Sequence, residues 1–277
     1  MPGTLYLVPT PLGDPEDLSP RARHLLASVD LVACEDTRET IALLRRLDLQ
    51  AKQLTSYHDH NEDRRTPALI GRLQGGEDIA VVSDAGTPLL DDPGFTLVRA
   101  AIDADIEVVS VPGPSAALTG LVGSGIPLQR FCHVGFLPRA DGKRKTALMP
   151  LRHHPGPLIF FEAPHRMLRF LETLQMVLGD RSACLAVDLT RSYERYQRGR
   201  LSQLHALLSE QEKIRGQFTI IVEPPEERDD AARIERAVAA ARILAPHGVP
   251  RKALAEALAG ALDLPRRSVY QALLSDG

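Results

Sequence analysis

The chain has 277 residues, of which 44% are hydrophobic and 25% are charged, and its formal net charge is −3. This composition is typical of a globular protein and excludes a disordered or collagen-like chain. The length predicts two domains with room for a short appendage. We expect a cytoplasmic protein, because the N-terminal segment lacks the basic and long apolar regions of an export signal and no window reaches the roughly 18 apolar residues of a membrane-spanning helix.

The first part of the chain alternates short apolar runs with amphipathic segments. The runs are rich in β-branched residues and end in Gly, Pro or polar clusters, which is typical of buried strands. The alternation predicts a mostly parallel sheet covered by helices. The expected strands are Thr4–Val8, Asp30–Cys34, Ile79–Ser83 and Glu107–Val111, and the expected helices begin after the cap Ser19-Pro20 and span Glu62–Leu73 and Gly94–Ala104.

A second series of strands and helices begins near Phe131 and predicts another α/β domain. Beyond a polar linker at residues 223–230 only helical patterns remain, and the last two resemble a helix-turn-helix. The expected strands are Phe131–Phe136, Leu158–Phe161, Ala183–Val187 and Phe218–Val222, and the expected helices are Arg166–Leu178, Leu201–Gln211, Ala231–Leu244, Arg251–Leu258 and Pro265–Leu274.

The predicted fold class is therefore α/β, with two α/β domains and a small helical appendage. The turn Pro112-Gly-Pro-Ser115 breaks the chain just before a helix that begins at Ala116, so we place the domain boundary there. The predicted domains span residues 1–115 and 116–228, and the helix-turn-helix-like appendage spans residues 229–277.

The three cysteines stand singly in the sequence, at Cys34, Cys132 and Cys184. An odd number of widely separated cysteines fits neither a disulfide framework nor the paired spacing of a zinc site. We expect reduced, buried and structural thiols.

Polar loops follow several of the expected strands, and open α/β sheets bind ligands at the carboxyl ends of their strands. The loop at residues 83–94 contains two glycines, two prolines and three aspartates. Its backbone could hold the charged ends of a small cofactor while Leu89 and Leu90 cover an adenine. The alternatives are an ordinary connection in this loop, a plain turn at residues 9–14 and simple helix capping by Ser115.

The usual nucleotide fingerprints are missing from the sequence. There is no Gly-x-x-x-x-Gly-Lys-Ser/Thr motif, and residues 123–128 lack the third glycine of a dinucleotide-binding loop. These observations argue against an ATPase and against an ordinary dinucleotide enzyme.

The segments 35–38 and 56–65 hold more polar groups than a connection requires, which indicates the walls of a site. The alternative for the first segment is that its charges pair with one another and cap the following helix. His58, Asp59 and His60 could ligate a metal, but no helix-spaced histidine pair or cysteine supports them, so we expect no metal site.

Basic residues gather in two places despite the acidic total. Such patches can neutralise phosphates, although a solvated surface explains a charge run equally well. The two groups are Arg139, Lys143, Arg144, Lys145 and Arg152, and Arg191, Arg195, Arg198 and Arg200.

Seven motifs in order give the sequence a close resemblance to the ribosomal RNA small-subunit 2′-O-cytidine methyltransferases of the tetrapyrrole-methylase superfamily. The resemblance runs from about residue 4 to residue 223, with mild departures at Pro9, Asp14, Ala163 and Asp188. The motifs are Thr10-Pro-Leu-Gly-Asp14, Glu35-Asp-Thr-Arg38, Ser56-Tyr-His-Asp-His-Asn-Glu62, Ser83-Asp-Ala-Gly-Thr-Pro88, Pro112-Gly-Pro-Ser-Ala116, Glu162-Ala-Pro-His-Arg166 and Asp188-Leu-Thr-Arg191.

The resemblance implies a homodimer that binds S-adenosylmethionine in the cleft between two α/β domains. It also implies methylation of the 2′-hydroxyl of a decoding-centre cytidine, position 1402 of 16S ribosomal RNA, in free RNA or in the small subunit. By position, the cofactor should contact Thr10, Pro11, Leu12, Asp84, Ala85, Gly86, Thr87, Leu90, Ser115, Ala116, Phe161 and Glu162.

Methyl transfer to a ribose hydroxyl needs an aligned geometry and a group that accepts the proton, but no metal. Asp36, His58 and Glu62 are candidates for that group, and Arg38 for a clamp on phosphate or ribose. An unpaired nucleotide would be easier to admit than a paired one. The candidate RNA contacts are Arg139, Lys143, Arg144, Lys145, His165, Arg166 and Arg191.

Two other functions remain open at this point. One is a small-molecule methyltransferase of the same superfamily that methylates a tetrapyrrole carbon. The other is a non-catalytic ribosome-assembly factor that keeps the fold. Such a factor would not need intact cofactor loops, and in this sequence they are intact.

Overall fold

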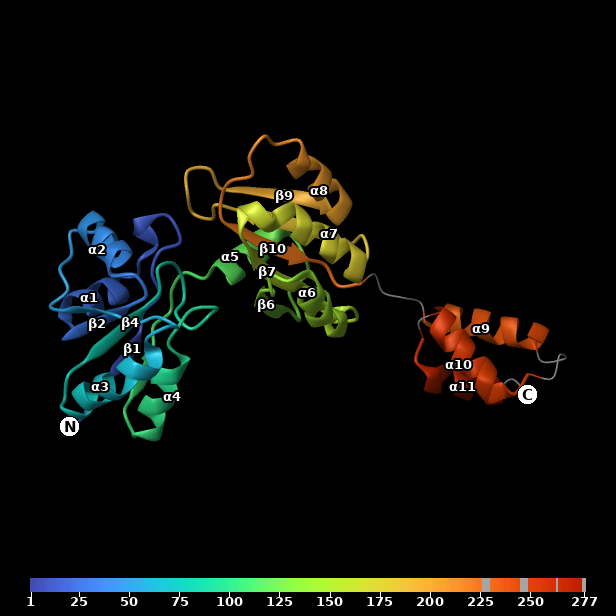
Figure 1. Cartoon of the computed structure of the whole chain (residues 1–277), viewed down its shortest axis with the longest axis horizontal. Coiled ribbons are helices and arrows are strands. Elements are labelled where there is room, and N and C mark those ends of the chain that lie inside the picture. The colour runs from blue at the N-terminus through green and yellow to red at the C-terminus, as the bar shows by residue number, and fades with distance from the viewer. Residues whose placement is uncertain (226–229, 245–248, 263, 276–277) are drawn as a thin grey trace. The chain divides into compact units, whose positions relative to one another are not determined.

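The computed structural model describes residues 1–225, 230–244, 249–262 and 264–275 (Figure 1). Its contacts group residues Met1–Pro224 into one compact unit and Pro225–Gly277 into another. The first unit contains two five-stranded sheets, and the second contains helices. Among the described residues, no helix has the length and apolar character needed to cross a membrane.

The first sheet is entirely parallel, in the order β3-β2-β4-β1-β5. All four residues of β2 and of β4 are buried, as expected of central strands covered on both faces. The strands are β1 (Leu5–Leu7), β2 (Leu31–Cys34), β3 (Leu54–Ser56), β4 (Ile79–Val82) and β5 (Val108–Ser110).

Helices cover both faces of this sheet. Packing of α1 and α2 forms one apolar core, and packing of α3 and α4 forms the other (Figure 1). The predicted cap is confirmed, because the Ser19 hydroxyl accepts a hydrogen bond from the Ala22 N–H at 3.1 Å and Pro20 opens the helix. The helices are α1 (Pro20–Ser28), α2 (Thr37–Arg46), α3 (Glu62–Gln74) and α4 (Phe95–Asp103), with a short 3-10 helix at Pro15–Asp17.

The second sheet has the order β6-β7-β10-β8-β9, and only its β6–β7 pair is parallel. One face packs against α6, α7 and α8, and the other packs against α5, which follows β5 directly in the chain. The elements are α5 (Ala116–Ser124), β6 (Cys132–Phe136), α6 (Asp141–Leu148), β7 (Leu158–Glu162), α7 (Met167–Leu178), β8 (Ser182–Val187), β9 (Arg195–Arg200), α8 (Leu201–Ser209) and β10 (Phe218–Val222), with 3-10 helices at Met149–Leu151 and Pro164–Arg166.

Every predicted strand is present within one or two residues of its expected ends, but two further strands were missed. Both β3 and β9 lie at an edge of their sheet. An edge strand is half-exposed and tolerates charge, so it need not carry the apolar run that reveals a buried strand. The sequence of β9, Arg-Tyr-Gln-Arg-Gly-Arg, shows this directly.

The second compact unit consists of α9 (Asp230–Leu244), α10 (Arg251–Leu262) and α11 (Arg266–Ser275). Ala237, Leu254 and Val269 belong to one apolar core that the three helices share. The predicted boundary at residues 228 and 229 and the turn residue Asp263 lie outside the described residues. We propose the division into residues 1–115, 116–228 and 229–277 on the basis of the two separate sheets and the helical unit.

All three cysteines are free thiols. Cys34 and Cys184 are buried, as expected, whereas Cys132 is half-buried.

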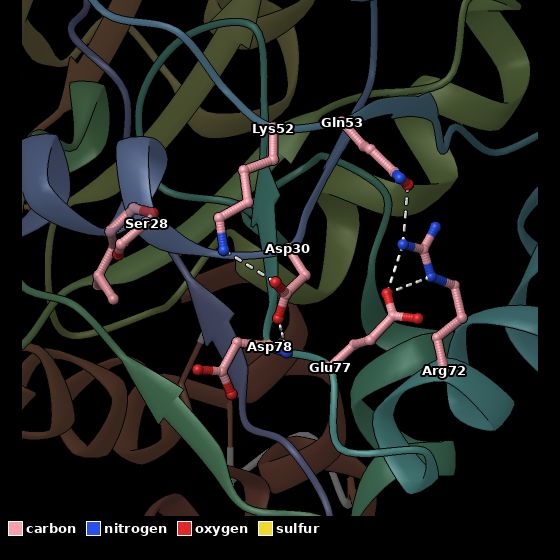
Figure 2. A network of polar contacts seen from close by, with 8 residues as sticks. Ser28, Asp30, Lys52, Gln53, Arg72, Glu77 and Asp78 are labelled. Atoms are coloured by element: carbon pink, nitrogen blue, oxygen red, sulfur yellow. Dashed lines mark hydrogen bonds and ion pairs between the residues drawn. The ribbon is translucent and has the colours of Figure 1, made fainter.

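The amino-terminal edge of the first sheet carries charges that are paired with one another (Figure 2). Asp30 accepts hydrogen bonds from the Lys52 ammonium at 2.9 Å and from the Asp78 N–H at 3.0 Å. Arg72 donates to Glu77 at 2.6 Å and to Gln53. These contacts tie together the segments that lead into β2, β3 and β4.

Candidate functional site

Three loops meet at the carboxyl edge of the first sheet. Thr10 and Gly86 exchange two backbone hydrogen bonds of 2.9 and 3.0 Å, which join the loops after β1 and β4. The Thr87 hydroxyl donates to the Pro114 carbonyl at 2.8 Å and joins the loop after β5. Gly86 has φ +90°, a conformation that a residue with a side chain rarely adopts, so glycine is needed where the chain turns toward Thr10.

A cavity of about 390 Å³, here called the first cavity, lies between these loops and the second sheet. Leu12, Leu90 and Phe161 give it apolar walls, while backbone groups and carboxylates supply its polar part. A space of this kind suits a small amphipathic ligand. The full lining is Leu12, Glu35, Asp84–Thr87, Leu90–Asp92, Ser115, Ala116, Phe136, Phe161–Pro164 and Gly216–Thr219.

The structure brings together most of the residues predicted to contact a cofactor. All of them line the first cavity except Thr10, which is 1% exposed beneath the loop, and Pro11, which lines a neighbouring cavity. Ser115 also caps α5, because its hydroxyl accepts a hydrogen bond from the Leu118 N–H. Capping and cavity lining are therefore compatible at this residue.

Several lining residues were not predicted from the sequence, notably Asp91, Asp92, Phe136 and the segment Gly216–Thr219. The last segment leads into β10, which runs antiparallel to β7. It is therefore the amino end of β10 that reaches the cavity, and a rule based on carboxyl ends does not find it. Asp91 and Asp92 lie in a loop that the sequence did single out, next to Leu90.

The first cavity is strongly acidic. Burial and the neighbouring carboxylates, above all Glu35, raise the pKa of Asp92 to about 7. Partial burial and the charge of Asp84 raise the pKa of Glu35, and partial burial raises the pKa of Asp84. Among the described residues that line the cavity there is no Lys, Arg or His.

Asp91 connects the loop that follows β4 to the second sheet. Its carboxylate lies 2.7 Å from Nε2 of His133, whose ring packs edge-on against Phe161. Gly135 of the same strand has φ +68°, and a side chain there would overlap the Asp91 carboxylate. The glycine thus allows the aspartate to approach β6.

Glu162 is the most deeply buried carboxylate of the cavity, with 3% of the residue exposed. Its Oε1 atom accepts hydrogen bonds from the Arg166 guanidinium at 2.6 Å and from the Ala163 N–H at 2.8 Å. Its Oε2 atom is buried and has no hydrogen-bond partner among the described residues. A buried polar atom of this kind is costly unless a ligand or water satisfies it.

A larger cavity of about 870 Å³, here called the second cavity, adjoins the first. The two share Leu12, Asp84, Ala85 and Gln217 in their walls. The second cavity is polar and carries two arginines from different elements. The rest of its lining is Pro11, Gly13–Pro15, Asp36, Glu39, Ala42, Leu43, Arg46 and Thr190–Ser192.

The predicted catalytic residues Asp36 and Arg38 pair with each other. Asp36 caps α2 through the Arg38 N–H at 2.8 Å, and its Oδ2 lies 2.5 Å from the Arg38 guanidinium. This hydrogen bonding lowers the pKa of Asp36 to about 2, which makes it a weak proton acceptor. The alternative of local pairing and capping therefore describes the geometry, although Asp36 does line the second cavity.

The other two predicted catalytic residues, His58 and Glu62, line neither of these cavities. Nε2 of His58 lies 3.0 Å from the Asn61 amide, and Glu62 opens α3. His58 is close enough to influence the charge of Glu35.

The predicted RNA contacts divide into three groups. Arg191 lines the second cavity, whereas Arg166 is held by Glu162. Arg144 does not fit the prediction, because only 1% of it is exposed and its guanidinium pairs with Asp141. The side chains that remain at the surface are Arg139, Lys143 and His165, with Lys145 half-buried.

Comparison with known proteins gives the architecture a family. The sequence profile of the tetrapyrrole (corrin/porphyrin) methylases matches residues 4–205. Ribosomal RNA small subunit methyltransferase I of Micromonospora olivasterospora is 48% identical over 97% of this chain and 86% of its own length. The protein of the same name from Escherichia coli O157:H7 is 45% identical over 80% of this chain and 78% of its own.

The chain belongs to the tetrapyrrole methylases, and within them to the ribosomal RNA small subunit methyltransferase I family. Solved structures agree on the family fold. The uroporphyrin-III C-methyl transferase of Thermus thermophilus, complexed with S-adenyl homocysteine, aligns with a TM-score of 0.57 at 22% identity over 80% of this chain and 97% of its own. A diphthine synthase aligns with a TM-score of 0.62 at 15% identity over 80% of this chain and 90% of its own.

Within the described parts of the chain, no group of three or more His, Cys, Asp or Glu side chains is arranged to hold a metal ion. His58 and His60 have ring centroids 6.0 Å apart and contact each other edge-on.

Proposed function

We propose that the protein is an S-adenosylmethionine-dependent methyltransferase that acts on small-subunit ribosomal RNA, at the 2′-hydroxyl of a decoding-centre cytidine. Relatives that are 41 to 48% identical over nearly the whole chain carry the name ribosomal RNA small subunit methyltransferase I, which supports the methylation of this RNA. The observation that carries the proposal is the pair of adjoining cavities that share Asp84. The first has the size and apolar walls for the cofactor, and the second is larger and polar, with two arginines in its lining.

The residues of the first cavity fit S-adenosylmethionine. Leu90 and Phe161 offer apolar surface for an adenine, and the buried Oε2 atom of Glu162 is an unsatisfied acceptor for an amino or hydroxyl group. The free N–H groups at the start of α5 suit a carboxylate. When bound there, the cofactor supplies an electrophilic methyl group on a positively charged sulfur.

Asp84 is the best placed group to accept the proton of the ribose hydroxyl. It is the only carboxylate among the described residues that lines both cavities. Partial burial raises its pKa above the usual aspartate value, which favours proton transfer, whereas Arg38 holds Asp36 in its ionised form. We therefore rank Asp84 above the predicted candidates Asp36, His58 and Glu62.

Two arginines of the second cavity offer positive charge to an RNA backbone, beside the carboxylates of Asp14, Asp36, Glu39 and Asp84. Arg46 stands at the end of α2 and Arg191 in the loop between β8 and β9, so the two come from different sheets. Two separated cations can hold the phosphates on either side of one nucleotide. The homodimer, the cytoplasmic location and the surface contacts through Arg139, Lys143 and His165 remain part of the proposal.

The test is methylation of small ribosomal subunits taken from cells that lack this protein. Purified protein is incubated with the subunits and radiolabelled S-adenosylmethionine, and the label is mapped by nuclease digestion and mass spectrometry. Label on the ribose of a single cytidine is expected. Cofactor binding without any labelling of RNA, together with methylation of a tetrapyrrole, would replace this function with the small-molecule activity of the wider family.

A further inference from the structure

We propose that the first cavity selects S-adenosylmethionine over the product S-adenosylhomocysteine by charge, through the carboxylates of Glu35, Asp84, Asp91 and Asp92. The inference rests on the proposed function, because it concerns how that cofactor is bound and exchanged. It assigns these residues a role in ligand specificity that the methyl transfer itself does not require.

The four carboxylates come from two loops and surround one space. Glu35 follows β2, and the other three lie in the loop that follows β4. Asp91 is paired with His133, and Asp84 accepts a hydrogen bond from the Asp36 N–H at 3.0 Å. Among the described residues, neither Glu35 nor Asp92 forms an ion pair with a basic side chain. The cavity therefore keeps a negative charge that the protein does not neutralise.

An independent observation on the opposite wall points to a ligand in the same space. Glu162 belongs to β7 of the second sheet, and its side chain is fully buried. Arg166 and the Ala163 N–H satisfy only its Oε1 atom, and the Oε2 atom has no hydrogen-bond partner among the described residues. A ligand that carries hydrogen-bond donors and positive charge satisfies both walls at once.

The substrate and product forms of the cofactor differ in the property that these walls detect. S-adenosylmethionine carries a sulfonium and an ammonium against one carboxylate, for a net charge of +1. On transfer, the bond between the methyl carbon and sulfur breaks, its electron pair stays on sulfur, and the ribose oxygen forms the new bond and loses its proton. The product is then a neutral thioether with the same ammonium and carboxylate, so one unit of attraction disappears as the reaction ends.

This difference affects turnover. In a partly buried site, one unit charge roughly 10 Å away changes affinity by about tenfold, and a nearer charge changes it more. The acidic walls therefore bind S-adenosylmethionine more tightly than S-adenosylhomocysteine. This difference in affinity limits inhibition by the product.

The experiment compares three ligands by calorimetry at pH 8, where Asp92 is ionised. The ligands are S-adenosylmethionine, S-adenosylhomocysteine and sinefungin, an analogue in which a charged amine replaces the methylated sulfur. The variants are Asp92→Asn and Glu35→Gln. The matched control is Asp103→Asn, which removes an exposed carboxylate at the far end of α4.

We expect each cavity variant to weaken the binding of S-adenosylmethionine and of sinefungin by about fivefold to tenfold. The affinity for S-adenosylhomocysteine should change by less than about twofold. The control should change none of the three. Equal weakening of all three ligands would overturn the inference, because the carboxylates would then hold a shared part of the ligand or the fold, and so would the absence of any change. Failure of the unmodified protein to bind either cofactor form would instead contradict the proposed function.

Discussion

The two edges of the first sheet both carry acidic residues but treat them in opposite ways. At the amino edge, Asp30 is paired with Lys52, and this hydrogen bond lowers its pKa (Figure 2). At the carboxyl edge, Asp92 has a pKa raised to about 7 and faces other carboxylates. The paired charges at the amino edge stabilise the fold. The carboxylates at the carboxyl edge repel one another, and a positively charged ligand would stabilise their ionised forms.

Unpaired charge therefore indicates the functional edge of the sheet better than the presence of charge alone. Asp36 illustrates the point, because it lies at the carboxyl edge but pairs with Arg38 and caps the amino end of α2. Its lowered pKa resembles that of Asp30 more than that of its neighbour Glu35. Perturbed groups in a cavity are candidates for chemistry, and paired groups are usually structural.

The largest effect is expected at Asp84, where the two cavities meet. Asp84→Asn keeps an acceptor for the Asp36 N–H but removes the proton acceptor, so kcat for ribosomal RNA should fall by about 100-fold. The dissociation constant for S-adenosylmethionine should change by less than about tenfold. Single-turnover kinetics and calorimetry measure the two quantities. An unchanged kcat would remove Asp84 from the chemistry.

The arginines of the second cavity should affect RNA and not the cofactor. Arg46→Gln and Arg191→Gln keep the aliphatic stems and remove the charges, so each should weaken binding of the small subunit by about tenfold and reduce its salt dependence by about one unit. Arg99→Gln, which removes an exposed charge on α4, is the control. If cofactor affinity changed equally, the separation of the two cavities would be wrong.

The raised pKa of Asp92 should make the free energy of unfolding depend on pH. Its folded pKa lies above its unfolded value, so the folded state loses stability as the pH rises from about 4 to 7. Asp92→Asn should therefore raise the melting temperature at pH 8 by about 4 °C and leave it unchanged at pH 4. Thermal unfolding across this range checks the sign, and a lower melting temperature at pH 8 would contradict it.

Asp30 should show the opposite dependence with a smaller size. Its folded pKa is lowered, so its contribution is present above about pH 4 and is lost as the pH falls through the folded pKa. Asp30→Asn should lower the melting temperature by about 2 °C at pH 7, because an exposed ion pair contributes little, and by less under acid. Methylation should stay at the level of the unmodified protein. A loss of activity would break the distinction between the two edges.

Much of the architecture could be predicted because buried strands and helix caps leave a local record. The apolar run at Ile79–Val82 and the cap at Ser19 are each legible within a few residues. The loop at residues 83–94 was recognisable as a ligand loop because its glycines, prolines and aspartates follow a strand of an α/β sheet. These features depend on neighbours in the chain.

The misses have physical causes of another kind. Arg144 lies within a basic run, but the fold buries it against Asp141, and no pattern of charges reveals that. The segment Gly216–Thr219 enters the site because β10 is antiparallel, a property of sheet pairing and not of its own sequence. Glu162 was expected from the resemblance, yet its unsatisfied oxygen appears only when the partners of its other oxygen are known.

Most of the strands, the caps, the polar loops and the family could be recognised in the sequence, because each is set by short-range preference or by ordered motifs. Which carboxylates are buried, and which lie near other carboxylates, depends on the tertiary structure. Asp36 and Glu162 pair with Arg38 and Arg166, which are close by in the chain. Asp30 pairs with Lys52, 22 residues away, and Asp92 lies near Glu35 of another loop. Electrostatic energy falls with distance in space, so the division between structural and functional carboxylates is made by the fold.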